Sequence, residues 1–253
     1  MDWVASTMKH EDTIIQRGVG AGLRFNPGGS NAGYLLGLIE FNVQRALQLW
    51  LRPGMTVYDV GANVGFITMI AARLVGRSGR VIAIEPVPAL ADEVWHNARL
   101  NGFENVSVIQ AALGDIDGQA EFALSQNLTM GRLADSKDRR DDENHLKVKL
   151  RRLDTLAIQE SLRGPDLVKV DAEGAEVAIL DGATELLSKA HPMLLIELHT
   201  TNQAVGRRLD QLGYVARALE GGTPIKNCAP NACVAAVPKQ RDNELARMIS
   251  ALH

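Results

Sequence analysis

Short apolar runs alternate with segments of helical periodicity from Thr56 onward. This alternation is typical of βαβ units, which build a mostly parallel sheet with helices on both of its faces. The runs that predict strands are residues 57–60, 80–85, 106–110, 167–171, 193–199, 214–219 and 232–237. The segments that predict helices are residues 64–75, 89–100 and 173–187, the last interrupted near Gly182. We therefore expect an α/β fold with a seven-stranded, mostly parallel sheet.

The ends of the chain extend this pattern. Residues 35–51 carry apolar side chains at helical spacing and end before Pro53-Gly54, which predicts a helix that caps one edge of the sheet. Residues 1–34 are rich in glycine and predict an irregular extension. We expect an N-terminal extension with a capping helix over 1–52, a main domain over 53–238, and a C-terminal helix over 239–253 that packs on the sheet.

The rhythm of strands and helices breaks between residues 118 and 153. Residues 119–124 and 146–153 alternate between apolar and polar side chains, which predicts an insertion with two antiparallel strands. Their connection, residues 136–144, is almost entirely polar and charged. Two interpretations stay open for it, a solvated loop and a lid over the substrate.

Charge and composition exclude several classes of function. The 27 Lys and Arg residues are balanced by 30 Asp and Glu residues, so the net charge of the chain does not favour binding to nucleic acid or to an anionic membrane. The chain has no apolar run near the roughly 20 residues of a membrane helix, and its start lacks the order of a signal peptide. Cys228 and Cys233 are too few for a disulfide framework. We expect a cytoplasmic protein without nucleic-acid or membrane partners.

Candidate chemistry begins where the first predicted strand runs into a glycine-rich turn, Asp59-Val-Gly61-Ala-Asn63-Val-Gly65. The glycines let the backbone pass close to a ligand, and the following helix offers free N–H groups. A nicotinamide fingerprint requires Gly-x-Gly-x-x-Gly, but Asn63 occupies the position of the second glycine. Asp59, Gly61, Asn63 and Gly65 are therefore predicted to bind a cofactor, and their pattern resembles motif I of class I S-adenosylmethionine-dependent methyltransferases.

Two further segments are predicted to contact the adenosine part of such a cofactor. Glu85 lies 20 residues after Gly65 at the end of the next predicted strand, where a carboxylate can accept hydrogen bonds from both ribose hydroxyls. Ala112, Leu113 and Asp115 follow the third predicted strand, where the adenine edge is expected.

A longer series of motifs resembles the FkbM family of S-adenosylmethionine-dependent methyltransferases. The motifs are Pro53-Gly-Met55, the turn from Asp59 to Gly65, Glu85-Pro86, Asn97, Ala112-Leu-Gly-Asp115, Leu153-Asp-Thr-Leu156, Lys169-Val-Asp-Ala-Glu-Gly-Ala-Glu176, Leu180-Asp-Gly-Ala183 and Glu197-Leu-His199. The resemblance extends from about residue 33 to 214. It implies a Rossmann-like class I methyltransferase fold and O-methylation of a hydroxyl on a small-molecule, sugar or secondary-metabolite acceptor. It also implies that Glu40, in Gly37-Leu-Ile-Glu40, faces the cofactor pocket, although a helix-surface role stays open.

The predicted catalytic residues follow the ends of two strands. Asp171 and Glu173 follow one strand and His199 ends another, and ligands of open α/β sheets lie at these carboxyl ends. His199 is the predicted base, because the ordinary imidazole pKa near 6.5 leaves it mostly neutral at pH 7. Alternatively, Asp171, Glu173 and His199 bind a divalent metal that lowers the pKa of the acceptor hydroxyl. Glu197 is either a structural ion-pair partner or part of the site.

Other functions compete with O-methylation. The same fold supports transfer to nitrogen or carbon. Asn63 and the lack of a Tyr-x-x-x-Lys pair disfavour a nicotinamide-dependent oxidoreductase. The acidic residues at the strand ends disfavour a non-catalytic cofactor-binding module. The sequence predicts neither the identity of the acceptor nor the oligomeric state.

Overall fold

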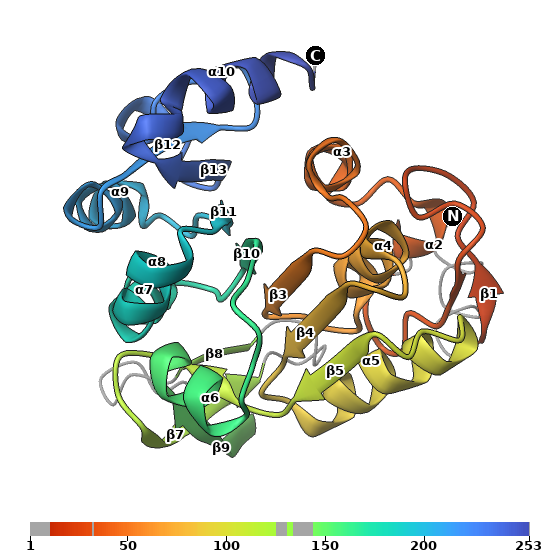
Figure 1. Ribbon diagram of the computed structural model, residues 1–253. Coiled ribbons are helices and arrows are strands. Elements are labelled where there is room, and N and C mark those ends of the chain that lie inside the picture. Colours follow the sequence, from red (N-terminus) through yellow and green to blue (C-terminus); the bar gives the residue numbers. More distant parts are fainter. Residues whose placement is uncertain (1–10, 32, 125–130, 134–143, 253) are drawn as a thin grey trace.

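A seven-stranded sheet forms the centre of the computed structural model, which describes residues 11–31, 33–124, 131–133 and 144–252 (Figure 1). The strand order is β12-β13-β11-β10-β3-β4-β5. The strands are β3 (Thr56–Val60), β4 (Arg80–Ile84), β5 (Val106–Ile109), β10 (Leu167–Val170), β11 (Met193–Glu197), β12 (Tyr214–Ala218) and β13 (Cys233–Pro238). Only β13 runs antiparallel to the other six strands of this sheet. The predicted sheet is confirmed, and each strand lies within two residues of its predicted bounds.

Helices cover both faces of this sheet (Figure 1). They are α2 (Gly33–Leu36), α3 (Phe41–Trp50), α4 (Phe66–Val75), α5 (Pro88–Leu100), α6 (Leu153–Gln159), α7 (Glu176–Gly182), α8 (Thr184–Ala190), α9 (Asn202–Gln211), α10 (Asp242–Ser250) and two short 3-10 turns, Ile225–Asn227 and Lys239–Arg241. Neighbouring side chains of a strand point to opposite faces, so Val57 and Tyr58 of β3 enter two different cores. Helices α3, α4, α5 and α10 pack on the face of Val57, and α6 to α9 pack on the face of Tyr58.

The segment that predicts one helix over residues 35–51 contains a break. Helix α2 ends at Leu36 and α3 begins at Phe41. Between them, Gly37 and Glu40 have positive φ angles of 71° and 51°, which no α-helix accommodates. A Cβ atom at Gly37 would lie 1.9 Å from the carbonyl oxygen of Arg17, so the N-terminal extension crosses the chain at this turn.

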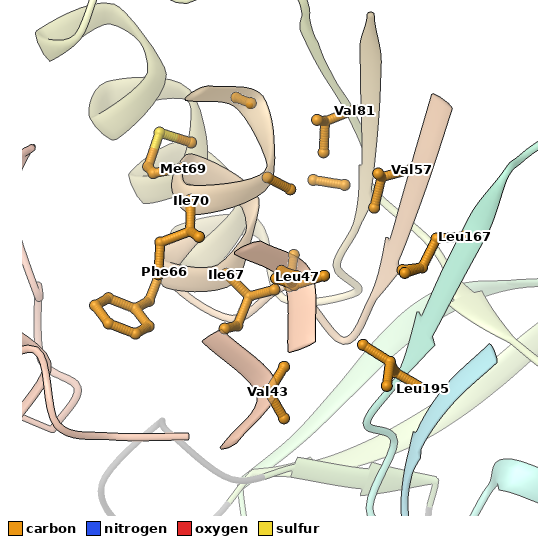
Figure 2. Packing of buried hydrophobic residues seen from close by; sticks show 14 of the residues in the cluster. Val43, Leu47, Val57, Phe66, Ile67, Met69, Ile70, Val81, Leu167 and Leu195 are labelled. Atoms are coloured by element: carbon orange, nitrogen blue, oxygen red, sulfur yellow. The ribbon is translucent and has the colours of Figure 1, made fainter. Parts of the chain in front are cut away.

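Helix α3 packs against the middle of the sheet. Its side chains Val43 and Leu47 share a core with Val57 of β3, Leu167 of β10 and Leu195 of β11 (Figure 2). These three strands are neighbours at the centre of the strand order. The prediction that this helix caps an edge was therefore wrong. The apolar spacing predicted a buried helix face, but it held no information on which part of the sheet would cover that face.

The N-terminal extension is attached to the glycine-rich turn. It contains the short strands β1 (Thr13–Ile14) and β2 (Arg24–Phe25). Next to β2, the backbone N–H of Asn26 donates to the buried Asn97 side chain at 2.7 Å. The Asn97 amide donates in turn to the carbonyl oxygens of Asn26 and Val64, both at 2.9 Å. Asn97 therefore joins the extension, α5 and the turn.

The insertion forms a second sheet with the order β6-β9-β7-β8. Strand β7 (Gly118–Leu124) pairs antiparallel with β9 (Asn144–Arg151), which confirms the two predicted strands. Strands β6 (Ala112–Leu113) and β8 (Gly131–Leu133) were not predicted. The connection predicted as a loop or a lid lies outside the described residues, apart from Asn144 in β9.

The C-terminal tail forms α10, whose Leu245 and Ile249 enter the core on the face of α3. The tail therefore packs on its own sheet, as the apolar spacing predicts. None of the helices in the described part of the chain combines the length and the apolar character that crossing a membrane requires.

Candidate active site

The glycine-rich turn lies where the strand order reverses. The chain leaves β3 for β4 and β5 on one side and later returns to β10 on the other, so the ends of β3 and β10 flank the switch point. Gly61 has a φ of 76°, and a Cβ atom there would lie 1.8 Å from the carbonyl oxygen of Asp171. Gly65 precedes α4 with a φ of 86° and packs on Val94 of α5. At both glycines, atoms of a neighbouring segment therefore leave little or no room for a side chain.

Glu85 is anchored to the turn by two backbone hydrogen bonds. The N–H of Asn63 donates to Oε2 at 2.8 Å, and the N–H of Val87 donates to Oε1 at 3.0 Å. Each carboxylate oxygen can accept a further hydrogen bond. Glu85 is buried, and burial raises its pKa to about 7. The carboxylate is thus fixed in position and retains acceptor capacity for a ligand.

A pocket opens beside Glu85 and encloses about 680 Å³ of space, part of it open to solvent. Residues predicted from the sequence that line the pocket are Gly61, Asn63, Glu85, Ala112, Leu113, Asp171 and Glu173. Phe122 of β7 also lines it and was not predicted as a site residue. The apolar face of its strand was the only sequence signal for it.

Other predicted cofactor residues do not line the pocket. Asp59 is fully buried below it and accepts a hydrogen bond from the Thr68 hydroxyl at 2.6 Å, which ties β3 to α4. Asp115 is exposed and does not reach the pocket. The chain turns away before it, because Ala112 and Leu113 pair with β9 and the N–H of Gly114 donates to the carbonyl oxygen of Arg151.

Lys169 forms the centre of a buried group of charges next to the pocket. Its ammonium lies 3.2 Å from Asp171 Oδ2, 3.6 Å from Glu40 Oε2 and 3.9 Å from Asp59 Oδ1. Burial alone would lower the pKa of Lys169, but the charges of these carboxylates outweigh it and raise the pKa. Lys169 therefore stays protonated. Lys169 was not among the predicted site residues, although a lysine within an apolar strand indicates buried pairing.

Glu40 and Glu197 belong to the same group. Oxygen atoms of Glu40, Asp171 and Glu197 lie within 4.8 Å of one another, and burial raises the pKa of Glu40 to about 7. Burial and the charge of Asp171 also raise the pKa of Glu197. Glu40 thus faces Lys169 at the break before α3, and it does not line the pocket itself.

Asp171, Glu173 and His199 converge at the carboxyl ends of β10 and β11. His199 Nε2 lies 3.5 Å from Glu173 Oε2 and 3.7 Å from Asp171 Oδ1. One donor atom from each residue lies within 4.8 Å of the other two. Two carboxylates and an imidazole can act on an acceptor proton or coordinate a divalent cation.

A fourth residue, Glu176, controls the charge of His199. Its Oε1 lies 2.8 Å from His199 Nδ1. This hydrogen bond raises the pKa of His199 to about 9. The expectation that His199 is mostly neutral at pH 7 was therefore wrong, because an ordinary imidazole pKa does not apply beside a buried carboxylate. The motif contained Glu176, but nothing in the sequence showed that it faces His199.

Comparisons with known proteins identify the family of this chain. The profile of the Methyltransferase FkbM domain matches residues 59–223. The crystal structure of methyltransferase FkbM from Methylobacillus flagellatus KT superposes with a TM-score of 0.51 and 18% sequence identity. The superposition covers 80% of this chain and 46% of that one. At this identity the likeness concerns the fold.

Curated relatives match over shorter stretches. A ribosomal protein L11 methyltransferase from Pelotomaculum thermopropionicum is 37% identical over 83 residues, which are 32% of this chain and 26% of the relative. Methyltransferase 1 from Beauveria bassiana is 27% identical over 143 residues, 50% of this chain and 57% of the relative. The chain thus spans less than two thirds of either relative. The chain belongs to the FkbM family of methyltransferases, which are S-adenosylmethionine-dependent and have a Rossmann-like fold.

Proposed function

We propose that this methyltransferase transfers a methyl group to a hydroxyl oxygen of a small-molecule acceptor, such as a sugar or a secondary metabolite. The observation that carries the proposal is the convergence of Asp171, Glu173 and His199 beside the pocket. An alcohol is a poor nucleophile and benefits from a base that removes its proton as it reacts, a contribution of about 10²–10⁴-fold. This cluster offers such a base together with groups that orient it.

The residues of the pocket fit S-adenosylmethionine, which supplies the methyl group on a sulfonium. Glu85 is buried, fixed by Asn63 and Val87, and retains acceptor capacity for two ribose hydroxyls. Ala112 and Leu113 form an apolar wall suited to adenine. Gly61 and Asp171, at the ends of β3 and β10, would lie beside the reacting end of the bound cofactor.

In this proposal His199 Nε2 accepts the proton of the acceptor hydroxyl while the oxygen bonds to the methyl carbon. The carbon–sulfur bond breaks, and its electron pair remains on sulfur. Asp171 and Glu173 flank Nε2 and orient the acceptor or the imidazole. Because the pKa of His199 is about 9, only the neutral fraction of the enzyme works at pH 7.

Metal assistance is the second candidate mechanism. Asp171, Glu173 and His199 offer carboxylate and imidazole donors whose atoms lie close enough to share an ion. A bound divalent cation would lower the pKa of the acceptor hydroxyl. Dialysis against EDTA tests this mechanism, because loss of activity that Mg²⁺ or Mn²⁺ restores would replace His199 as the base.

Transfer of labelled methyl from S-adenosylmethionine into a panel of hydroxylated metabolites tests the proposed function. We expect label on oxygen, located by mass spectrometry of the product. Label found only on nitrogen, on carbon or in protein would contradict O-methylation of small molecules. Label in protein must be measured as well, since the names of the curated relatives include protein-L-isoaspartate O-methyltransferase. A cytoplasmic location without nucleic-acid or membrane partners is part of the proposal and rests on the sequence.

A further inference from the structure

We propose that Glu176 is a positioning residue: its carboxylate holds the imidazole of His199 with Nδ1 protonated, so that Nε2 is the nitrogen that faces the acceptor. The inference rests on the proposed role of His199 in O-methylation and deepens it. It assigns a function to a buried carboxylate that the pocket itself does not explain, since Glu176 is not among the lining residues.

Three donors fix the carboxylate of Glu176. Oε1 accepts a hydrogen bond from the N–H of Gly174 at 2.9 Å and lies 2.8 Å from His199 Nδ1. Oε2 accepts a hydrogen bond from the Thr201 hydroxyl at 2.9 Å. The Glu176 side chain is fully buried, whereas the His199 side chain is 22% exposed. A carboxylate held this firmly has little freedom to follow the imidazole, so the imidazole must follow the carboxylate.

The contact determines which nitrogen carries a proton. An ionised carboxylate only accepts hydrogen bonds, so the nitrogen at 2.8 Å from Oε1 must be the donor. When the imidazole is neutral, its other nitrogen is then an acceptor. That nitrogen, Nε2, faces Glu173 and Asp171. A carboxylate that orients the base of a reaction in this way controls its tautomer without touching the substrate.

The local backbone explains how Glu176 and Glu173 reach opposite nitrogens of one ring. Glu173 and Gly174 have positive φ angles of 46° and 101°, which turn the chain sharply after β10. Glu176 then begins α7 below the turn. Glu173 is consequently presented to Nε2 from the exposed side, while Glu176 reaches Nδ1 from the interior.

A double-mutant cycle tests this role, with Glu176→Gln, His199→Ala and the combined variant on an identified acceptor. Glu176→Gln should lower kcat by at least about 10-fold, with the KM for S-adenosylmethionine changed less than about 2-fold, because the loss concerns base orientation. In the His199→Ala background the same substitution should have no further effect. Glu185→Gln is the matched control, since Glu185 is 62% exposed and pairs with Lys189 on α8. Equal losses of kcat in both backgrounds would overturn the proposal and indicate a structural role.

Nuclear magnetic resonance supplies a readout that needs no acceptor. In the unsubstituted enzyme labelled with ¹⁵N, at a pH above about 9 where the imidazole is neutral, we expect a slowly exchanging Nδ1–H proton of His199 and an unprotonated Nε2, and we expect Glu176→Gln to abolish the protection of Nδ1–H from exchange. A His199 with its proton only on Nε2 would overturn the proposal, and this result is accessible even if Glu176→Gln does not fold. If the Nδ1–H signal is present but no hydroxyl acceptor is methylated, the orientation of the imidazole by Glu176 stands and the proposed function fails.

Discussion

Gly61 and Asp171 meet so closely that the space of a side chain at residue 61 is already filled by the carbonyl oxygen of Asp171. The Cβ of an alanine there would lie 1.8 Å from that oxygen. The two residues follow neighbouring parallel strands on either side of the switch point. This glycine of motif I is therefore required by the close approach of the neighbouring strand.

Gly61→Ala should destabilise the fold by about 2–4 kcal/mol, because it adds a backbone clash to the cost of a positive φ angle. Unfolding in urea measures the loss. Gly118→Ala is the control, since a Cβ at Gly118 would have no atom within 4 Å. A Gly61→Ala variant as stable as the control would refute the close approach.

Glu85 should make cofactor affinity depend on pH. Its pKa is about 7 in the free enzyme, and ribose hydroxyls donate hydrogen bonds to the ionised form. Binding is therefore favoured as pH rises through 7, and titration calorimetry with S-adenosylhomocysteine should show tighter binding at pH 8 than at pH 6. Glu85→Gln should flatten this dependence, whereas Glu104→Gln, on an exposed residue, should preserve it. A pH-independent affinity in the unsubstituted enzyme would contradict the role of Glu85.

Glu85→Ala should weaken S-adenosylhomocysteine binding by about 2–4 kcal/mol, because two hydrogen bonds to a charged group are lost and water replaces part of them. The same calorimetric titration measures the loss. Unchanged affinity would mean that the ribose binds elsewhere.

The charge of His199 predicts an alkaline pH profile. With a pKa of about 9, about one imidazole in a hundred is neutral at pH 7, so kcat should rise with pH and level off above about 9. Steady-state rates at saturating acceptor and cofactor measure this profile. A kcat that levels off near pH 6.5 would mean that Glu176 does not raise the pKa of the base.

The same proton stabilises the folded state. A raised histidine pKa contributes stability fully below the unfolded pKa near 6.5, and the contribution is lost as pH rises through about 9. Between pH 6 and pH 10, the unsubstituted enzyme should lose up to about 3 kcal/mol more unfolding free energy than His199→Asn does. His191→Asn, at the exposed C-terminal cap of α8, is the control substitution. Equal losses of unfolding free energy in all three proteins would contradict the raised pKa of His199.

Local patterns in the sequence were sufficient for most of the fold. Alternating apolar runs predicted all seven strands of the main sheet, because burial on two faces produces a strong signal. The break before α3 was missed because the residues on both sides keep helical spacing. It arises from the contact between Gly37 and the carbonyl oxygen of Arg17, which joins segments far apart in the chain.

The site was less predictable because its energetics depend on tertiary contacts. The positions of Asp171, Glu173 and His199 at strand ends were enough to predict that these residues lie together. The contact of Glu176 with His199 and the carboxylates around Lys169 were not predicted, because both arise only in the folded chain. The role of Asp115 at the adenine edge stays a prediction: the residue is exposed and outside the pocket lining, because the pairing of β6 with β9 directs the chain there.

The most direct test of the mechanism compares His199→Ala with the unsubstituted enzyme on a verified acceptor, in buffer containing EDTA. We predict that kcat falls by about 10²-fold or more, the loss expected when a general base is removed. The affinity for S-adenosylhomocysteine, measured by calorimetry, should stay unchanged, and EDTA should not affect the unsubstituted enzyme. Near-full activity of His199→Ala, or activity that EDTA abolishes and Mg²⁺ restores, would contradict proton removal by His199.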